Sequence, residues 1–357
     1  MARSTMIDWD LAVTAATTMV GPGPTMARAD ADAVVAELRA GAKRSTPLVR
    51  EFTGLPAPEG TARTAPLLVV DRRGWVQANV DGFATIISPL IDRLQEKKGT
   101  PGPVAEAVGS RVTGLELGAL LGFMSSKVLG QFDPFYAPAG SADAGRMLLV
   151  APNIAHAENE LGVDPTDFRL WVCLHEETHR VQFTAVPWMR DHIHSEIANL
   201  VESVEIDPAK LAGLVGEGAK RLSDLVRGSD DVSLLDLVQS PEQKVVLDRI
   251  TGVMSLLEGH ADVVMDGVGP EVIPSVAEIR RKFNQRRKGA GTFDRILRRL
   301  LGLDAKMAQY RNGAAFVRAA VDAVGMDGFN KVWVAPENLP SKDEIGDPAS
   351  WVRRVHG

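Results

Sequence analysis

The feature that most constrains the fold of this chain is a pair of histidines, His175 and His179, spaced four residues apart in a strongly apolar segment. On an α-helix this spacing places both side chains on one face, one turn apart. Two neutral imidazoles held in that way can bind one zinc ion, and Glu176 flanks the same position, where it can accept a proton from an activated water molecule. Glu177 is rotated by about 200° from His175 and is predicted to point away from the metal.

The surrounding residues predict that this segment is one buried helix. Asp164 followed by Pro165 is typical of a helix start, with the aspartate as the N-cap, and Pro187 marks the end. Apolar side chains occupy nearly the whole circumference between these limits, at Phe168, Leu170, Trp171, Val172, Leu174, Val181 and Phe183. Buried histidines and carboxylates require partners, because an unpaired buried polar group is costly. A bound metal ion would supply those partners.

The third ligand has to come from elsewhere in the chain, and the best candidate is Glu258. The extended motif that continues with a glycine and a third histidine is absent, since Gln182 and Ala185 occupy those positions. Glu258 and Asp262 are four residues apart, so Glu258 can bind the metal while Asp262 accepts the free ring N–H of a ligand histidine. His260, which would lie on another side of the same helix, is the competing third ligand.

The segment that carries Glu258 is also predicted to be a helix. Ser240 is the expected N-cap, Pro241 takes the first helical position and Gln243 completes a capping box. Gly267 is the expected end of this helix. Its apolar residues favour a packed helix over a solvated one.

At these residues the chain resembles the gluzincin group of metallopeptidases, in which a glutamate on a second helix completes the His-Glu-x-x-His site. A closer resemblance, over most of the chain, is to a zincin-like metallopeptidase family of uncharacterised hydrolases, one branch of which is labelled as associated with the biosynthesis of a deazaflavin coenzyme. It is carried by the segments His175–Arg180, Leu257–Asp262, Lys306–Tyr310 and Glu337–Trp351. The resemblance implies a zincin-type catalytic core and a Zn²⁺ cofactor, but it implies no known substrate.

Catalysis of this kind needs a hydrogen-bond donor that faces the oxyanion formed on the substrate carbonyl. Tyr310 and His260 are the two candidates, although Tyr310 could equally be a buried packing residue. Zincins commonly place an edge strand beside the metal, and the resemblance nominates Met147–Val150 for that role. The alternative for this segment is a short structural strand.

Several other residues that often bind metals or partners are expected to have ordinary roles here. Cys173 is the only cysteine, so it can form no disulfide within the chain and is expected to be a small buried hydrophobe. His192 and His194 are two residues apart, which places them on opposite sides of a helix and disfavours a second metal site. The cluster of basic residues within Arg280–Arg299 is expected to be a solvated face, and binding of an acidic partner is the alternative.

Composition and charge exclude several classes of protein. A net charge of −6 over 357 residues gives no general signal for nucleic-acid binding. No stretch of about 18 uncharged apolar residues is present, so we expect no membrane span. Gly114, Gly118 and Gly122 instead favour close packing between helices. The segment 1–23 lacks the basic and then apolar pattern of an export signal, and the protein is expected to be cytoplasmic.

The expected fold class is α+β and predominantly α-helical, with a zincin-like core built on a buried metal-binding helix and a small β element. The two β candidates are Leu67–Asp71 and Arg146–Ala151. The Pro- and Gly-containing segment Lys97–Pro103 is the clearest linker. We therefore predict a helical N-terminal region over 1–100 and a zincin-like catalytic region over 101–357, with one continuous domain over 1–357 as the alternative.

The function predicted from the sequence is that of a zinc-dependent hydrolase, specifically a metallopeptidase that acts on an amide bond. Its expected partner is a peptide or protein substrate, with neither a membrane nor a nucleic acid. Two alternatives remain open: a non-catalytic helical binding protein that uses the metal for stability, and a metal-dependent hydrolase of non-peptide bonds. The glutamate beside the histidines favours catalysis, because a structural site would not require it. The sequence predicts no oligomeric state.

Overall fold

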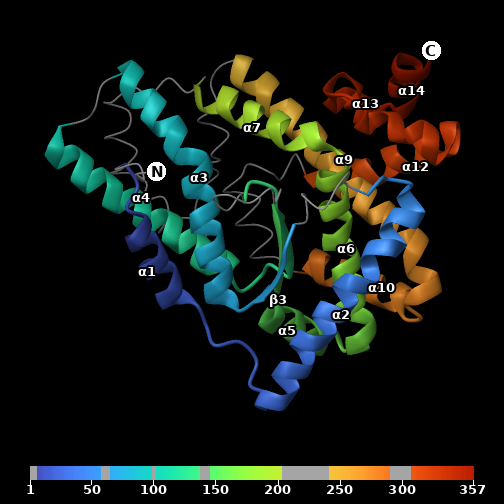
Figure 1. The fold of residues 1–357 in the computed structure, drawn as a ribbon, viewed down its shortest axis with the longest axis horizontal. Helices are drawn as coiled ribbons and strands as arrows, with labels where there is room; N and C mark the ends of the chain where they lie inside the picture. The colour runs from blue at the N-terminus through green and yellow to red at the C-terminus, as the bar shows by residue number, and fades with distance from the viewer. Residues whose placement is uncertain (1–5, 58–64, 99–101, 137–144, 203–240, 290–306) are drawn as a thin grey trace.

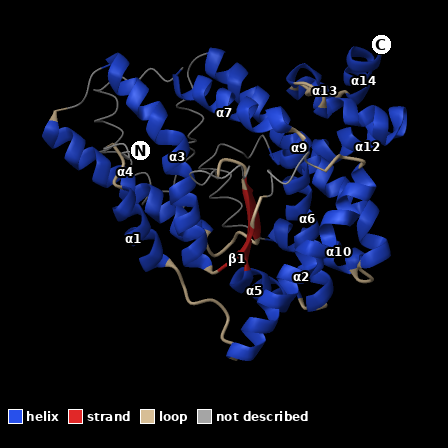
Figure 2. Ribbon diagram, in the orientation of Figure 1, coloured by secondary structure: helices blue, strands red, loops and turns tan. Residues whose placement is uncertain are grey.

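Helices build most of this protein around a small central sheet (Figures 1 and 2). The structure is a computed structural model that describes residues 6–57, 65–98, 102–136, 145–202, 241–289 and 307–357. The helices are α1 (Trp9–Met19), α2 (Arg28–Thr53), α3 (Arg72–Lys98), α4 (Pro103–Met124), α5 (Ala151–Leu161), α6 (Pro165–Ala185), α7 (Pro187–Glu202), α9 (Pro241–Val272), α10 (Val276–Gly289), α12 (Met307–Phe329), α13 (Lys342–Gly346) and α14 (Pro348–His356), with short 3₁₀ helices η2 (Asn330–Trp333) and η3 (Pro336–Asn338). The predicted α+β, mainly helical fold class is confirmed.

The sheet has three short strands, β1 (Leu67–Val70), β2 (Gly130–Asp133) and β3 (Arg146–Val150), in the order β1-β3-β2. β1 is parallel to β3, whereas β2 is antiparallel to it. Both predicted β segments are present. The nomination of Met147–Val150 as an edge strand is wrong, because β3 is paired on both sides and all five of its residues are buried. Within the described chain, β2 is the edge strand on the side of α6.

The sheet separates two hydrophobic cores, and β3 contributes alternate side chains to each. Met147 and Leu149 belong to the larger core, which includes residues of α2, α6, α9 and α12. Leu148 and Val150 belong to the smaller core, which includes residues of α1, α3 and α4. Figure 1 shows these two groups of helices on opposite sides of the strands. The buried strand thus holds both helical layers in place.

The larger core includes residues on both sides of residue 100, where the sequence predicts a boundary between two regions. Its residues extend from Val34 in α2 to Trp351 in α14. α3 ends at Lys98 and α4 begins at Pro103, close to the predicted linker, of which residues 99–101 lie outside the described part of the chain. The division into two regions therefore stays a prediction.

Glycines allow α4 to pack directly on the backbone of α1, as the sequence predicts. A Cβ atom at Gly114, Gly118 or Gly122 would lie 2.5 to 2.9 Å from a backbone oxygen at Asp8, Ala12 or Ala16, respectively. Such separations are too short for any side chain, so the spacing of glycines at every fourth position serves this helix crossing. None of the described helices has both the length and the apolar character needed to span a bilayer.

α9 extends beyond the end that the sequence predicts for it. Gly267 lies inside the helix, which continues to Val272, so the predicted stop at Gly267 is wrong. A Cβ atom at this glycine would lie 1.9 Å from Cε2 of Phe52, and Gly267 is therefore required for the approach of an aromatic ring from α2. The predicted N-cap Ser240 lies outside the described residues, and α9 begins at Pro241.

Candidate metal centre

α6 begins and packs as the sequence predicts, and this fixes the position of its two histidines. The side chain of Asp164 accepts a hydrogen bond of 2.9 Å from the backbone N–H of Asp167, and Pro165 occupies the first turn. Cys173 is fully buried on the side that faces α2, where its Sγ lies 3.5 Å from the carbonyl oxygen of Leu38. Burial raises the pKa of the Cys173 thiol, which agrees with its predicted packing role.

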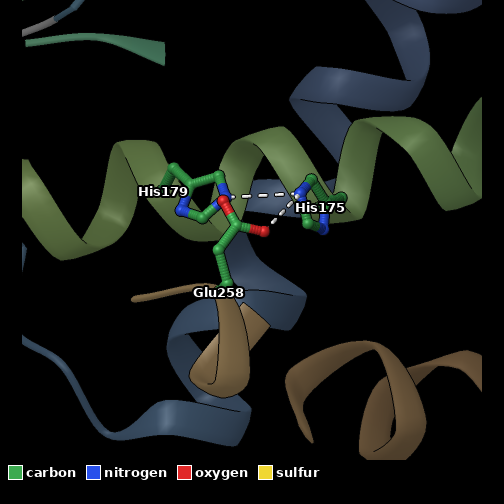
Figure 3. A group of neighbouring side chains, drawn as sticks. All are labelled: His175, His179 and Glu258. Carbon is green, nitrogen blue, oxygen red and sulfur yellow. Dashed lines mark hydrogen bonds and ion pairs between the residues drawn. The ribbon is translucent and has the colours of Figure 1, made fainter. Parts of the chain in front are cut away.

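Three side chains from α6 and α9 meet at one point: His175, His179 and Glu258 (Figure 3). One potential ligand atom from each residue lies within 4.8 Å of the other two. The Nε2 atoms of the two histidines are 3.3 Å apart. The Glu258 carboxylate lies 3.5 Å from Nε2 of His179 and 3.8 Å from Nε2 of His175. The structure thus brings together the three residues for which the sequence predicts metal binding.

The distances and the chemistry of these atoms fit a zinc ion. Two ligand atoms at ordinary zinc bond lengths and a tetrahedral angle are about 3.3 Å apart, which matches the separation of the two imidazole nitrogens. Nδ1 of His179 faces a side-chain carbonyl oxygen, so its proton belongs there and Nε2 presents a lone pair. Two imidazole nitrogens and a carboxylate that direct their lone pairs at one another repel each other. The same arrangement is favourable when a cation lies between them.

The outer nitrogen of each histidine has its own contact. His179 Nδ1 lies 3.0 Å from Oε1 of Gln182, and His175 Nδ1 lies 3.3 Å from Sδ of Met265.

Asp262 was predicted to accept a hydrogen bond from a ligand histidine. Its carboxylate lies 3.8 Å from a guanidinium nitrogen of Arg280, whose side chain also donates to the Asp262 backbone carbonyl at 2.9 Å. The role of Asp262 towards the histidines stays a prediction.

Glu176 is buried beside the metal-binding cluster, against the edge strand β2. A Cβ atom on Gly130, the first residue of β2, would lie 2.5 Å from Cγ of Glu176. Only a glycine therefore allows this glutamate side chain to lie flat on the strand. Burial, and secondarily the negative charge of Glu258, hold the pKa of Glu176 well above its ordinary value. A cation bound by the neighbouring residues would lower the pKa of Glu176 and so favour its ionised carboxylate.

Glu177 faces away from the metal-binding cluster and anchors α6 to its neighbours. Both of its carboxylate oxygens accept hydrogen bonds from the guanidinium of Arg180, at 2.8 and 2.9 Å. Arg180 also donates to the backbone carbonyl of Ala65 and to the hydroxyl of Thr46 in α2. The two adjacent glutamates of the motif thus have different surroundings, as the helical geometry predicts.

His260 lies in the protein interior, where a substrate would not reach it. It is fully buried, its ring lies against those of Phe329 and Trp333, and its Nδ1 is 3.0 Å from Nε2 of Gln182. Burial, with the nearby His179, lowers its pKa to about 3, so the ring is neutral. This location favours a supporting role over the predicted contact with an oxyanion. Tyr310, the other predicted donor, lies in the first turn of α12, and its side chain is outside the described part of the structure.

The remaining polar candidates lie outside the cluster. His192 and His194, on α7, pack against the rings of Trp188 and Phe135, and the one group of metal-binding residues found in the described chain includes neither. In the basic segment, Arg280 pairs with Asp266 at 2.7 Å and Lys282 with Glu278 at 2.7 Å. Further along this segment, the side chains of residues 286–289 and all of residues 290–299 lie outside the described part of the structure.

Sequence reasoning missed two residues that shape this site, Gln182 and Gly130. Gln182 lies three residues after His179, which on a helix is the same face, so its position could have identified it as a partner of that histidine. Gly130 gave no comparable signal, because its contact with Glu176 joins segments far apart in the sequence.

Comparisons with known proteins identify a family and a similar solved structure. A family model described as zincin-like metallopeptidase matches residues 7–352. A solved structure from Chloroflexus aurantiacus, described as "a putative hydrolase with a novel fold", is 33% identical in sequence, with a TM-score of 0.68 over 98% of each chain. No curated protein matches the sequence.

Proposed function

Since the chain belongs to the zincin-like metallopeptidase family, we propose that it is a zinc-dependent peptidase in which His175, His179 and Glu258 bind the ion. The family, the structural neighbour and the candidate site together support a metal-dependent hydrolase. The observation that carries the finer proposal is the meeting of two imidazoles and a carboxylate within 4.8 Å, with Glu176 buried beside them.

Glu176 would act as the general base. When bound, zinc would lower the pKa of a coordinated water molecule and supply a nucleophile near neutral pH. The carboxylate of Glu176 would accept the proton of the attacking water and pass it to the leaving amine. Burial against Gly130 keeps this carboxylate in one place and away from bulk water. Glu258, more exposed than the histidines, would complete the ligand set.

The edge strand β2 would bind an extended peptide next to Glu176. The backbone N–H of Val150 donates to the carbonyl of Leu129 at 2.8 Å. Hydrogen-bonded pairs alternate along an antiparallel ladder, so Gln131 and Asp133 also pair with β3, whereas the N–H and C=O groups of Gly130 and Phe132 face the opposite edge. Addition of a substrate strand at such an edge is a common mode of peptide recognition. This geometry supports a peptide substrate over a small ester or phosphate.

The number of protein ligands supports catalysis over a purely structural metal. Structural zinc sites usually have four protein ligands, whereas catalytic sites have three and an open position. Among the described residues the cluster contains three such groups, and the side chains of His175 and Glu258 are 27% and 40% exposed. A substrate could therefore approach the ion from the side of these two residues.

The test is cleavage of a broad peptide library, followed by mass spectrometry, for the zinc-loaded protein, the chelated protein and the Glu176→Gln variant. We expect cleavage only by the zinc-loaded wild type. The glutamine variant should keep its zinc but lose about 10²- to 10⁴-fold in rate, because an amide cannot accept the proton. Cleavage by Glu176→Gln at the wild-type rate would exclude Glu176 as the base. Hydrolysis of non-peptide substrates alone would support the other class of hydrolase.

A further inference from the structure

The buried side-chain amide of Gln182 makes three hydrogen-bond contacts. One is with His179 on the same helix, and the other two, with Leu257 and His260, connect α6 to α9. Its Oε1 lies 3.0 Å from Nδ1 of His179. Its Nε2 lies 3.0 Å from the carbonyl oxygen of Leu257 and 3.0 Å from Nδ1 of His260. The side chain is fully buried, so solvent does not compete for these contacts.

The orientation of the Gln182 amide follows from its contact with Leu257. A backbone carbonyl can only accept, so the NH₂ group must face Leu257. Oε1 then faces His179 and accepts the proton of its Nδ1, which leaves the Nε2 lone pair directed at the metal-binding cluster. The second N–H of the amide points to Nδ1 of His260, which must be the unprotonated nitrogen of that neutral ring. One fixed acceptor thus determines the tautomers of both histidines.

The surroundings of His260 give independent support for this role. Its ring centroid lies 5.6 Å from that of Phe329 and 5.3 Å from that of Trp333. Its Nε2 is buried and has no hydrogen-bond partner in the described part of the protein. An unpaired buried N–H costs free energy that an apolar residue would avoid. Among the described residues, the single polar contact of this ring is the one between its Nδ1 and Gln182, which accounts for a histidine in an aromatic environment.

We propose that Gln182 is a positioning residue for the metal centre: it holds His179 in the tautomer and orientation that bind zinc, and His260 and Leu257 hold Gln182 in turn. The inference rests on the proposed zinc site. Hydrogen bonds to the outer nitrogen of a ligand histidine commonly change metal affinity by about 10- to 100-fold. The Gln182 amide is neutral, so it adds no charge next to the three ligands, of which Glu258 is the anionic one.

The test compares zinc affinity, measured by chelator competition, in Gln182→Met, Gln182→Glu and the wild type. Methionine has a similar length and no strong acceptor, so zinc affinity should fall by about 10- to 100-fold. Glutamate keeps an acceptor for His179, so its zinc affinity should exceed that of Gln182→Met, but it turns an oxygen towards the Leu257 carbonyl and should therefore stay below the wild type. Gln243→Met, at a buried glutamine in the first turn of α9, is the matched control and should bind zinc normally.

A packing role alone would give a different order, because both variants are close to glutamine in size and the buried charge of Gln182→Glu would make it the worse one. Wild-type affinity in Gln182→Met would overturn the inference while leaving the zinc site intact. If Gln182→Met fails to fold, nitrogen-15 NMR of the zinc-loaded wild type replaces it: a protonated Nδ1 on His179 is expected, and an unprotonated one would contradict the inference. Failure of the wild type to bind zinc would remove the site and the inference together.

Discussion

Glu258 is more exposed to solvent than its two histidine partners. Its side chain is 40% exposed, whereas that of His179 is 11% exposed and is supported by Gln182. An exposed carboxylate is solvated by water when no metal is present, so it adds little to the stability of the metal-free fold. His179 is buried and His175 is partly buried, and both belong to the packed helix α6. Metal affinity should therefore respond to Glu258 with little change in the stability of the metal-free fold.

We expect Glu258→Ala to lose most of its bound zinc because it removes one of three protein ligands. Asp262→Asn, four residues further along the same helix, leaves all three ligands in place and should weaken binding by at most about 10- to 100-fold. Isothermal titration of the metal-free variants with zinc measures both effects. Unchanged affinity in Glu258→Ala would show that the third ligand is another residue.

The residues of the motif could be predicted because a helix converts sequence spacing into geometry. His175, Glu176 and His179 needed only the helical repeat, and Glu258 was found from its spacing to Asp262 on a second helix. The contact of Gln182 with His260 could not be predicted, because it depends on how α6 and α9 lie against each other. Hydrogen-bond partners across helices follow from tertiary packing, for which one sequence carries no direct signal.

Among the elements, the crossing of α9 and α12 controls where Glu258 lies. The two helices touch through backbone atoms: a Cβ atom on Gly259 would lie 2.2 Å from the carbonyl carbon of Gly313, and one on Gly313 would lie 2.1 Å from the carbonyl oxygen of Ser255. Gly259 is adjacent to Glu258 in the sequence. Any side chain at this crossing must move α9, and with it the carboxylate that faces the histidines.

We therefore expect Gly259→Ala to lower the free energy of unfolding by about 1–3 kcal/mol, as overpacking commonly does, and to weaken zinc binding as well. Gly109→Ala in α4 is the matched control, because a Cβ atom there meets nothing within 4 Å. The control should be neutral, or more stable by up to about 1 kcal/mol, since alanine is the better helix former. Chemical denaturation and zinc titration of both variants test this, and equal behaviour of the two would contradict it.

The strand β2 is an element that the sequence failed to predict, because its local signal is weak. β2 has only four residues, Gly-Gln-Phe-Asp, with a glycine and an aspartate that disfavour a strand. Tertiary contacts stabilise it: Asp133 at its end forms a buried ion pair of 3.1 Å with Arg146 of β3, and Arg146 also donates to the carbonyl of Ala78 in α3. The helices α6 and α9, in contrast, carried enough apolar periodicity and capping residues for the sequence to predict them.

For the whole molecule, composition and pattern were sufficient for the fold class but not for the arrangement of its parts. Abundant helix-forming residues and two short β segments predict a helical α+β protein. The central position of β3, with one helical layer on each face, depends on contacts between distant segments, such as that of Leu67 in β1 with Met147. The same holds for the metal centre, in which α6 and α9 meet inside the larger core.

The most direct test of this account is the zinc content of the purified protein, measured by elemental analysis beside that of the His175→Ala/His179→Ala double variant. We predict about one zinc ion per chain for the wild type, because three ligand groups converge on a single point. The double variant should contain none, since one carboxylate alone does not retain the ion. A double variant that keeps a full equivalent of zinc would contradict the assignment of the metal centre.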